Sequence, residues 1–294
     1  MGPGFKYHVA TISAIFFALS IGLVVGSLYM SPGVASRQTN AIERLKKTLV
    51  EQNTTLNQQL SRDEQFIRDI TPMFLKDKLA GEPIAIVQTG DYPDATSEAR
   101  QALDLAGAHI LSVTTIHRAR PDEVLNAQLS ELHAQDPRFP TNRQGLVNAV
   151  AGVLAHGDAP GNPLMPALEE KDFLAKSPDS DYTTGARYVV IVAGSSDAAS
   201  NLHVADVDQP LITALQNRGV TVIACEEQNV QVPDIPTYNA LNLNLKIVDD
   251  VESDIGHCTL VMALREAREE TGGKPASADL SLPLQLGQDA GPQK

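Results

Sequence analysis

The sequence predicts an α/β protein in three parts: a transmembrane helix, a short coiled-coil stalk, and a domain built on a parallel sheet. Three patterns predict these parts: an uncharged apolar run near the N-terminus, a heptad-like spacing after it, and short apolar runs that alternate with helical segments. We place a membrane anchor at residues 1–33, the stalk at 34–80, the α/β domain at 81–270 and a disordered tail at 271–294.

The anchor is predicted from the stretch Val9–Met30, which contains no charged residue. A helix rises about 1.5 Å per residue, so about 20 apolar residues cross a hydrocarbon core roughly 30 Å thick. A secretory signal has a shorter apolar region that is followed by a small-residue cleavage site. No A-x-A site precedes Ser31. The stretch is therefore predicted to be a signal anchor that is retained in the finished protein.

Small residues recur at every fourth position of the anchor, at Ala14, Ala18, Gly22 and Gly26. Gly22 and Gly26 form a G-x-x-x-G motif, which lets the backbones of two membrane helices approach closely. We assign a membrane-helix contact to Ala18, Gly22 and Gly26. Because glycine is frequent in membrane helices generally, the alternative is an anchor without a dimer face.

The stalk is predicted to begin after Pro32-Gly33, which should interrupt the helix. Its apolar residues then follow the alternating spacing of three and four that is typical of a coiled coil. These residues are Ile42, Leu45, Leu49 and Leu56. Gln52 and Gln59 stand where the next leucines would be, and the apolar positions then shift to Leu60, as after a four-residue stutter. The alternative is one amphipathic helix packed on the following domain.

The α/β domain is predicted from runs rich in valine and isoleucine that alternate with helical segments. Such runs are typical of parallel strands buried on both faces, so we expect a Rossmann-like or flavodoxin-like sheet. The strands are predicted at 83–90, 108–116, 186–197, 219–227 and 245–251. The helices are predicted at 96–106, 121–133, 142–154, 207–217 and 253–270. The segment 157–181 is rich in glycine, proline and charge, which predicts a long surface excursion.

Composition argues against several classes of protein. The formal net charge is −13, whereas nucleic acid demands a basic surface. Cys225 and Cys258 are the two cysteines, and this count fits neither a disulfide scaffold nor a C-x-x-C zinc or redox protein. Whether the two cysteines pair is left open. Tryptophan is absent and aromatic residues make up 4%, which disfavours an aromatic platform for bases or sugars.

A candidate ligand site follows from two loops, "QTGDYPD" after the first strand and "AGSSDAAS" after the central strand. Ligands of open parallel sheets bind at the carboxyl ends of strands, where glycine amides and serine hydroxyls can hold an anion. The candidate residues are Gly90, Asp91, Gly194, Ser195, Ser196 and Asp197. Neither loop matches a dinucleotide or P-loop fingerprint. The alternative is that the small residues only form tight turns and that Ser196 or Asp197 caps a helix.

Catalytic and metal-ligating patterns are not found in the sequence. The segment after Gly194 lacks the second glycine of a G-x-S-x-G nucleophile elbow. The seven histidines form neither H-x-x-x-H nor H-E-x-x-H. His257 and Cys258 are adjacent soft ligands, but neighbouring positions on a helix do not share a face. We therefore expect no enzyme activity and no cofactor, and the sequence assigns no metal ligands.

The two ends of the chain together carry a resemblance. The opening "YHVATISAIFFALSIGLVVGS" and the closing "VDDVESDIGHCTLVMAL" resemble the copper transport outer-membrane protein family named for MctB. Asp249, Asp250, Gly256 and the apolar stretch 260–264 match the family's closing pattern, whereas the Gly-Gly-Lys-Pro at 272–275 replaces a Gly-His-Tyr-Gly-like segment. The resemblance implies a membrane-associated cell-envelope protein that takes part in copper efflux or tolerance, with copper ions as partners.

In some members the resemblance also implies channel formation, but one apolar helix cannot enclose a pore by itself. The anchor and stalk lie in series, so we expect a parallel homodimer or higher homo-oligomer.

The sequence leaves alternatives for the side of the membrane on which the body lies and for the function of the protein. Arg37, Arg44, Lys46 and Lys47 follow the span and only Lys6 precedes it, so the positive-inside rule favours a cytoplasmic body. The resemblance implies a single-pass protein of a bacterial-type cell envelope, and we lean to an extracytoplasmic body. A non-catalytic, dimeric, membrane-tethered adaptor is the alternative function. A third is an enzyme or nucleotide-binding module at the two loops.

Overall fold

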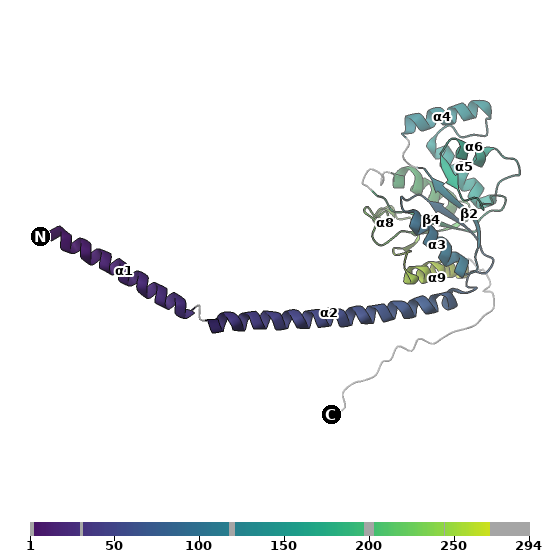
Figure 1. The fold of residues 1–294 in the computed structure, drawn as a ribbon. Helices are drawn as coiled ribbons and strands as arrows, with labels where there is room; N and C mark the ends of the chain where they lie inside the picture. The colour runs from purple at the N-terminus through teal and green to yellow at the C-terminus, as the bar shows by residue number, and fades with distance from the viewer. Residues whose placement is uncertain (1–2, 30–31, 118–120, 197–202, 244, 271–294) are drawn as a thin grey trace. The chain divides into compact units, whose positions relative to one another are not determined.

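The structure, a computed structural model, describes residues 3–29, 32–117, 121–196, 203–243 and 245–270. The tail predicted at 271–294 lies outside these residues. Contacts divide the chain into two compact units, Met1–Phe66 and Ile67–Lys294. We call the second unit the body and describe each unit by itself (Figure 1).

The first unit consists of helix α1 (Pro3–Tyr29) and most of helix α2 (Pro32–Leu75). Tyr7–Ser27 of α1 is long and apolar enough to cross a membrane, with a mean hydropathy of 2.3. Helix α2 begins at Pro32, where proline is tolerated because the first helical N–H groups have no partner within the helix. Pro32 and Gly33, where the sequence predicts an interruption, are instead the first two residues of α2, and residues 30 and 31 lie outside the described residues.

Apolar side chains of α2 remain exposed along the predicted stalk. Ile42, Leu45, Leu49, Leu56 and Leu60 are each at least 55% exposed. The last turns of α2 differ, because Thr71 and Leu75 are buried within the body, as is Leu79 just beyond the helix. The coiled coil stays a prediction for the earlier turns, whereas the end of α2 packs on the domain that follows it.

The body contains a six-stranded sheet of order β3-β2-β1-β4-β5-β6. Its strands are β1 (Pro83–Gln88), β2 (His109–Ile116), β3 (Leu174–Lys176), β4 (Tyr188–Val192), β5 (Thr221–Cys225) and β6 (Lys246–Val248). All neighbouring pairs are parallel except β2 and β3. The five parallel strands alone have the 2-1-3-4-5 order of flavodoxin-like sheets, and β3 adds an antiparallel edge. The predicted parallel sheet is therefore confirmed.

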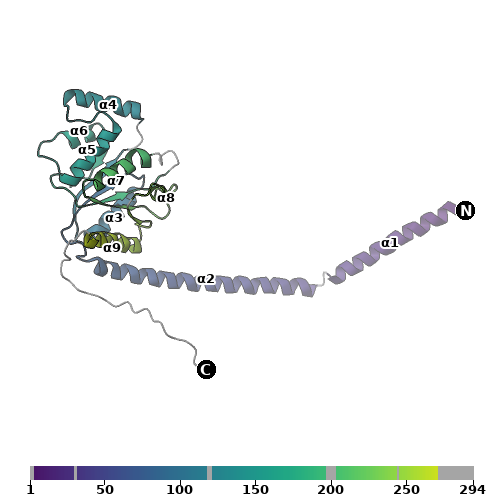
Figure 2. The same ribbon diagram turned by 180° about the vertical axis from the view of Figure 1, so that it is seen from behind.

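Helices cover both faces of this sheet (Figure 2). One face carries α3 (Pro93–Leu105), α9 (Asp254–Glu270) and the end of α2. The other carries α4 (Asp122–Gln135), α5 (Arg143–His156), the π-helix η2 (Val204–Asp208) and α7 (Gln209–Gln216). Strand residues alternate between the two cores, since Ile86 packs into the first and Val87 into the second. This double burial explains why the strands are apolar runs rather than alternating ones.

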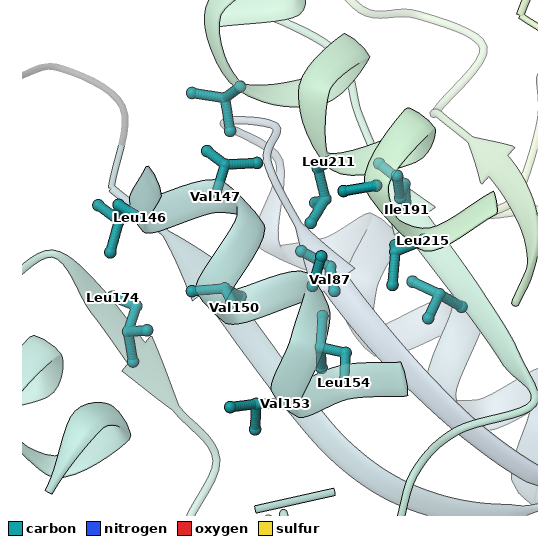
Figure 3. Packing of buried hydrophobic residues seen from close by; sticks show 14 of the residues in the cluster. Val87, Leu146, Val147, Val150, Val153, Leu154, Leu174, Ile191, Leu211 and Leu215 are labelled. Carbon is teal, nitrogen blue, oxygen red and sulfur yellow. The ribbon is translucent and has the colours of Figure 1, made fainter. Parts of the chain in front are cut away.

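Figure 3 shows the second core from close by. Val150 and Leu154 of α5 belong to the same buried cluster as Val87 of β1 and Ile191 of β4. Leu211 of α7 completes this layer and is fully buried. The layer supports the ends of β1 and β4, which carry the two loops of the predicted ligand site.

Three short elements were not predicted. The segment 157–181 is not only a surface excursion, because it contains α6 (Leu164–Glu170) and the edge strand β3. Helix α8 (Ile235–Ala240) follows β5. The helix predicted at 207–217 also begins earlier, as the π-helix η2. The three unpredicted elements have only three to seven residues each, and tertiary packing rather than propensity holds them.

Candidate functional site

The two loops of the predicted site meet at the carboxyl edge of the sheet. They follow β1 and β4, neighbouring strands at the point where the strand order reverses. The amide N–H of Gly90 donates to Val192 O at 2.9 Å, and that of Asp91 donates to Gly194 O at 2.9 Å. A Cβ on Gly90 would lie 2.4 Å from Ala193 O, so only glycine allows this approach. The structure thus brings the described candidate residues together, and Asp197 lies outside the described residues.

The donors of these loops are used within the protein. The amide of Gly194 donates to Asp234 Oδ2 at 2.8 Å, and the amide of Ser195 donates to Val232 O at 3.0 Å. The amide and hydroxyl of Ser196 both donate to Asp91 Oδ2, at 2.9 and 3.0 Å. These hydrogen bonds tie the loops to each other and to the segment before α8. Anion binding at the loops remains a prediction that these donors do not support.

A polar cluster inside the protein adjoins the second loop. We call His203, Asp208, Glu226, Asp234 and Tyr238 the buried cluster; none of them is more than 5% exposed. His203 immediately precedes η2 and Asp208 is its last residue. Asp234 immediately precedes α8 and Tyr238 lies within it, while Glu226 follows β5. The π-helix η2 and the unpredicted helix α8 therefore bring together residues that are far apart in the sequence.

His203 lies between two carboxylates of the buried cluster. Its Nε2 is 3.1 Å from Asp208 Oδ2 and 3.2 Å from Asp234 Oδ2. The Tyr238 hydroxyl donates to Asp208 Oδ2, while Ser195 Oγ donates to Asp234 Oδ1 at 3.3 Å. Each carboxylate is therefore held in place by neutral donors as well as by the imidazole.

Burial shifts the titration of two members of the cluster. It raises the pKa of Tyr238 well above its usual value, and the nearby carboxylate of Asp208 raises it further. It also raises the pKa of Glu226 to about 7, although the carboxylate accepts a hydrogen bond from the amide of Asp234 at 3.0 Å. The phenol is thus kept protonated so that it can donate to Asp208 at neutral pH.

Comparison with known proteins gives a family match that covers both units of the chain. The family model described as "Copper transport outer membrane protein, MctB" matches residues 4–274. The chain belongs to this family. The match runs from α1 to the end of α9, so it includes both the membrane-spanning candidate and the body. The resemblance inferred from the two ends of the sequence is confirmed.

Curated relatives agree with the MctB family assignment. The chain is 20% identical over 289 residues to the "Copper transporter MctB" of Mycobacterium bovis and to that of Mycobacterium tuberculosis. These alignments cover 89% of this chain and 91% of each relative. Among solved structures, a glutamate dehydrogenase covers 68% of this chain and 40% of its own, with a TM-score of 0.23 and 10% identity. That likeness is too low to inform the function of this MctB family member.

The soft ligands of this MctB family chain do not form a joint site. His257 Nε2 lies 3.1 Å from Glu98 Oε2 of α3, whereas Cys258 Sγ lies 4.0 Å from Thr71 Oγ1 at the end of α2. The two side chains point to different neighbours, as expected for adjacent helical residues. Cys225 and Cys258 are free thiols, and burial raises the pKa of both, more strongly for Cys225.

Sequence reasoning missed His203, Asp208 and Asp234. His203 and Asp208 are five residues apart, which is not a ligand spacing typical of α-helices, and they meet through a π-helix, whose hydrogen bonds join residues five apart. The amide of Gln209 accordingly donates to Val204 O. The sequence feature that could have indicated this site is a histidine and an aspartate close together just after the second loop. Nothing local indicated Asp234.

Proposed function

We propose that this protein is a non-catalytic, single-pass membrane protein of a bacterial-type cell envelope that takes part in copper efflux or homeostasis. The observation that carries this proposal is the MctB family match over residues 4–274. In the proposed topology Tyr7–Ser27 crosses the membrane and the body lies on the extracytoplasmic side. Because one helix cannot enclose a pore, copper handling is assigned to the body or to an assembly of several chains.

A strain that lacks the gene is expected to accumulate copper and to grow less well under copper stress. The physical reason is loss of an efflux component, so the cellular copper content should rise about twofold or more. Cellular copper is measured by mass spectrometry in the deletion strain and in the same strain carrying the gene again. Zinc content serves as the control. Unchanged copper content and copper tolerance would remove this function and leave the tethered adaptor as the leading account.

A specific observation favours a dimer. A dimer is expected both for the copper protein and for the membrane-tethered adaptor. The exposed leucines of α2 repeat at the spacing of a coiled-coil seam, and a second copy in register would cover them. The alternative function, a dimeric membrane-tethered adaptor, rests on this same stripe. In either case we propose a parallel homodimer through α2.

Replacing Leu49 with glutamate is expected to weaken the dimer at least about hundredfold. A buried leucine contributes about 1.5–3 kcal/mol, and one substitution removes two leucines from each dimer. The measurement is analytical ultracentrifugation of the full chain in detergent, together with chemical crosslinking. Thr54→Glu, five positions further along and on the outer face of the predicted coiled coil, is the matched control. A wild-type chain that is monomeric at every concentration would refute the dimer.

A further inference from the structure

We propose that His203, Asp208 and Asp234 bind one divalent transition-metal ion through one imidazole nitrogen and two carboxylate groups. The binding site is inferred from the geometry of the body. Its assignment to copper rests on the proposed function, which it deepens by naming the residues that would hold the metal.

The spacing of the three ligand atoms suits one ion. All of them lie within 4.8 Å of one another, and the Nε2 of His203 is 3.1 and 3.2 Å from the two carboxylate oxygens. Around an ion with ligand distances of about 2.0–2.2 Å, neighbouring ligand atoms lie roughly 3–3.5 Å apart. Small shifts of these side chains would therefore place all three atoms on one ion.

The charge of the buried cluster favours a cation. Asp208 and Asp234 are both 0% exposed. Among the described residues no lysine or arginine lies within ion-pair distance of either carboxylate. The basic side chain within that distance of both is His203. A single imidazolium offsets at most one of the two charges, whereas buried charges are stable only when they are paired. A divalent ion with a neutral imidazole would balance both carboxylates.

One carboxylate oxygen has no protein partner. Oδ1 of Asp208 is buried and accepts no hydrogen bond from any described residue. A buried polar atom without a partner costs about 1–3 kcal/mol, and such atoms are rare. A metal ion that is held by both oxygens of Asp208 would remove this deficit.

The neighbouring groups hold the ligands as they do in metal proteins. The Tyr238 hydroxyl donates to Asp208, while the Gly194 amide and the Ser195 hydroxyl donate to Asp234. Outer hydrogen bonds of this kind orient metal ligands. The π-helix that joins His203 and Asp208 belongs to a rare class of helix that is frequent at functional sites.

The ligand types select among metals. The set contains nitrogen and oxygen atoms but no sulfur, which favours Cu²⁺ or Zn²⁺ over Cu⁺. Affinities of such sites generally rise from Mn²⁺ to Cu²⁺ and fall again at Zn²⁺. We therefore expect Cu²⁺ to bind most tightly, Zn²⁺ less tightly and Mn²⁺ least.

The test uses the full chain in detergent without an affinity tag, first treated with a chelator and then equilibrated with Cu²⁺, Zn²⁺ or Mn²⁺. Metal per chain is measured after dialysis, and the melting temperature is followed by circular dichroism. One ion per chain and a raised melting temperature are expected. His203→Ala and Asp208→Asn should each lower the affinity at least about hundredfold, and Tyr238→Phe by about 10–100-fold. His109→Ala, a change at an exposed histidine, should leave binding unchanged.

Electron paramagnetic resonance of the Cu²⁺-loaded wild type provides a measurement that does not depend on variants. Coupling to one imidazole nitrogen is expected, and a spectrum without nitrogen coupling overturns the proposal. So does a wild type that retains no metal, or retention that is equal in wild type, His203→Ala and Asp208→Asn. Asp208→Asn preserves the shape of the side chain and serves if His203→Ala does not fold. Unchanged copper content in the deletion strain would remove the copper role, while metal binding by the purified chain would still stand.

Discussion

Gly256→Ala is expected to destabilise the body by about 3 kcal/mol or more, because there is no room for a methyl group. A Cβ at this position would lie 1.9 Å from Asp250 O and 2.6 Å from Asp250 C. Both atoms belong to the backbone, so no side chain can rotate away. Forcing extra volume into a packed site costs about 1–3 kcal/mol and occasionally more. Relief here would require moving α9 away from the core.

The position of Gly256 explains why the effect should be large. It lies in the first turn of α9, where its amide donates to Ser253 Oγ at 2.8 Å. The Ser253 hydroxyl in turn donates to Asp250 Oδ2 at 2.9 Å. Leu260 and Leu264 of the same helix are fully buried in the first core. Displacing the first turn would therefore disturb both the turn at Asp250 and the packing of α9.

The measurement is urea unfolding of the full chain, followed by circular dichroism. Gly152→Ala in α5 is the matched control, because the nearest atom to a Cβ there is Arg218 Nε at 4.0 Å. Alanine in a helix interior with free space should stabilise the protein by roughly 0.5–1 kcal/mol. Equal stability of Gly256→Ala and wild type would mean that the turn before α9 can yield, contrary to this packing argument.

Removing residues 1–31 is expected to move the protein from the membrane fraction to the soluble fraction. The segment Tyr7–Ser27 has a mean hydropathy of 2.3 and its side chains are exposed. In water such a helix exposes its whole apolar surface, and at about 25 cal/mol per Å² this is a cost of many kcal/mol. The chain that begins at Pro32 lacks this surface.

Cell fractionation with carbonate extraction measures the result. Gly22→Ala is the matched control, since it keeps the length and apolarity of α1 while nothing lies within 4 Å of the added Cβ. It should remain in the membrane fraction. A truncated chain that still resists extraction would show that α2 or the body binds the membrane without α1.

The strands and the apolar N-terminal helix could be predicted because their signals are local. Tyr188–Val192 is buried at every residue, so its valines and isoleucine form an unbroken apolar run. The candidate loops at Gly90 and Gly194 were placed together because parallel strands bring their carboxyl ends to one edge. The roles of their donors could not be predicted, since those depend on Val232 and Asp234, which come from a distant segment.

The sequence by itself determined the apolar N-terminal helix, the parallel sheet and the pairing of the two loops, because uncharged runs, buried strands and strand ends leave patterns between near neighbours. The resemblance of its two ends indicated the MctB family, which the match over residues 4–274 confirmed. The tertiary structure alone decided the edge strand β3, the helices α6 and α8 and the cluster of His203, Asp208 and Asp234. The short elements exist because the rest of the body packs against them. The cluster exists because a π-helix and a distant helix start converge in the interior, and no local spacing records such a convergence.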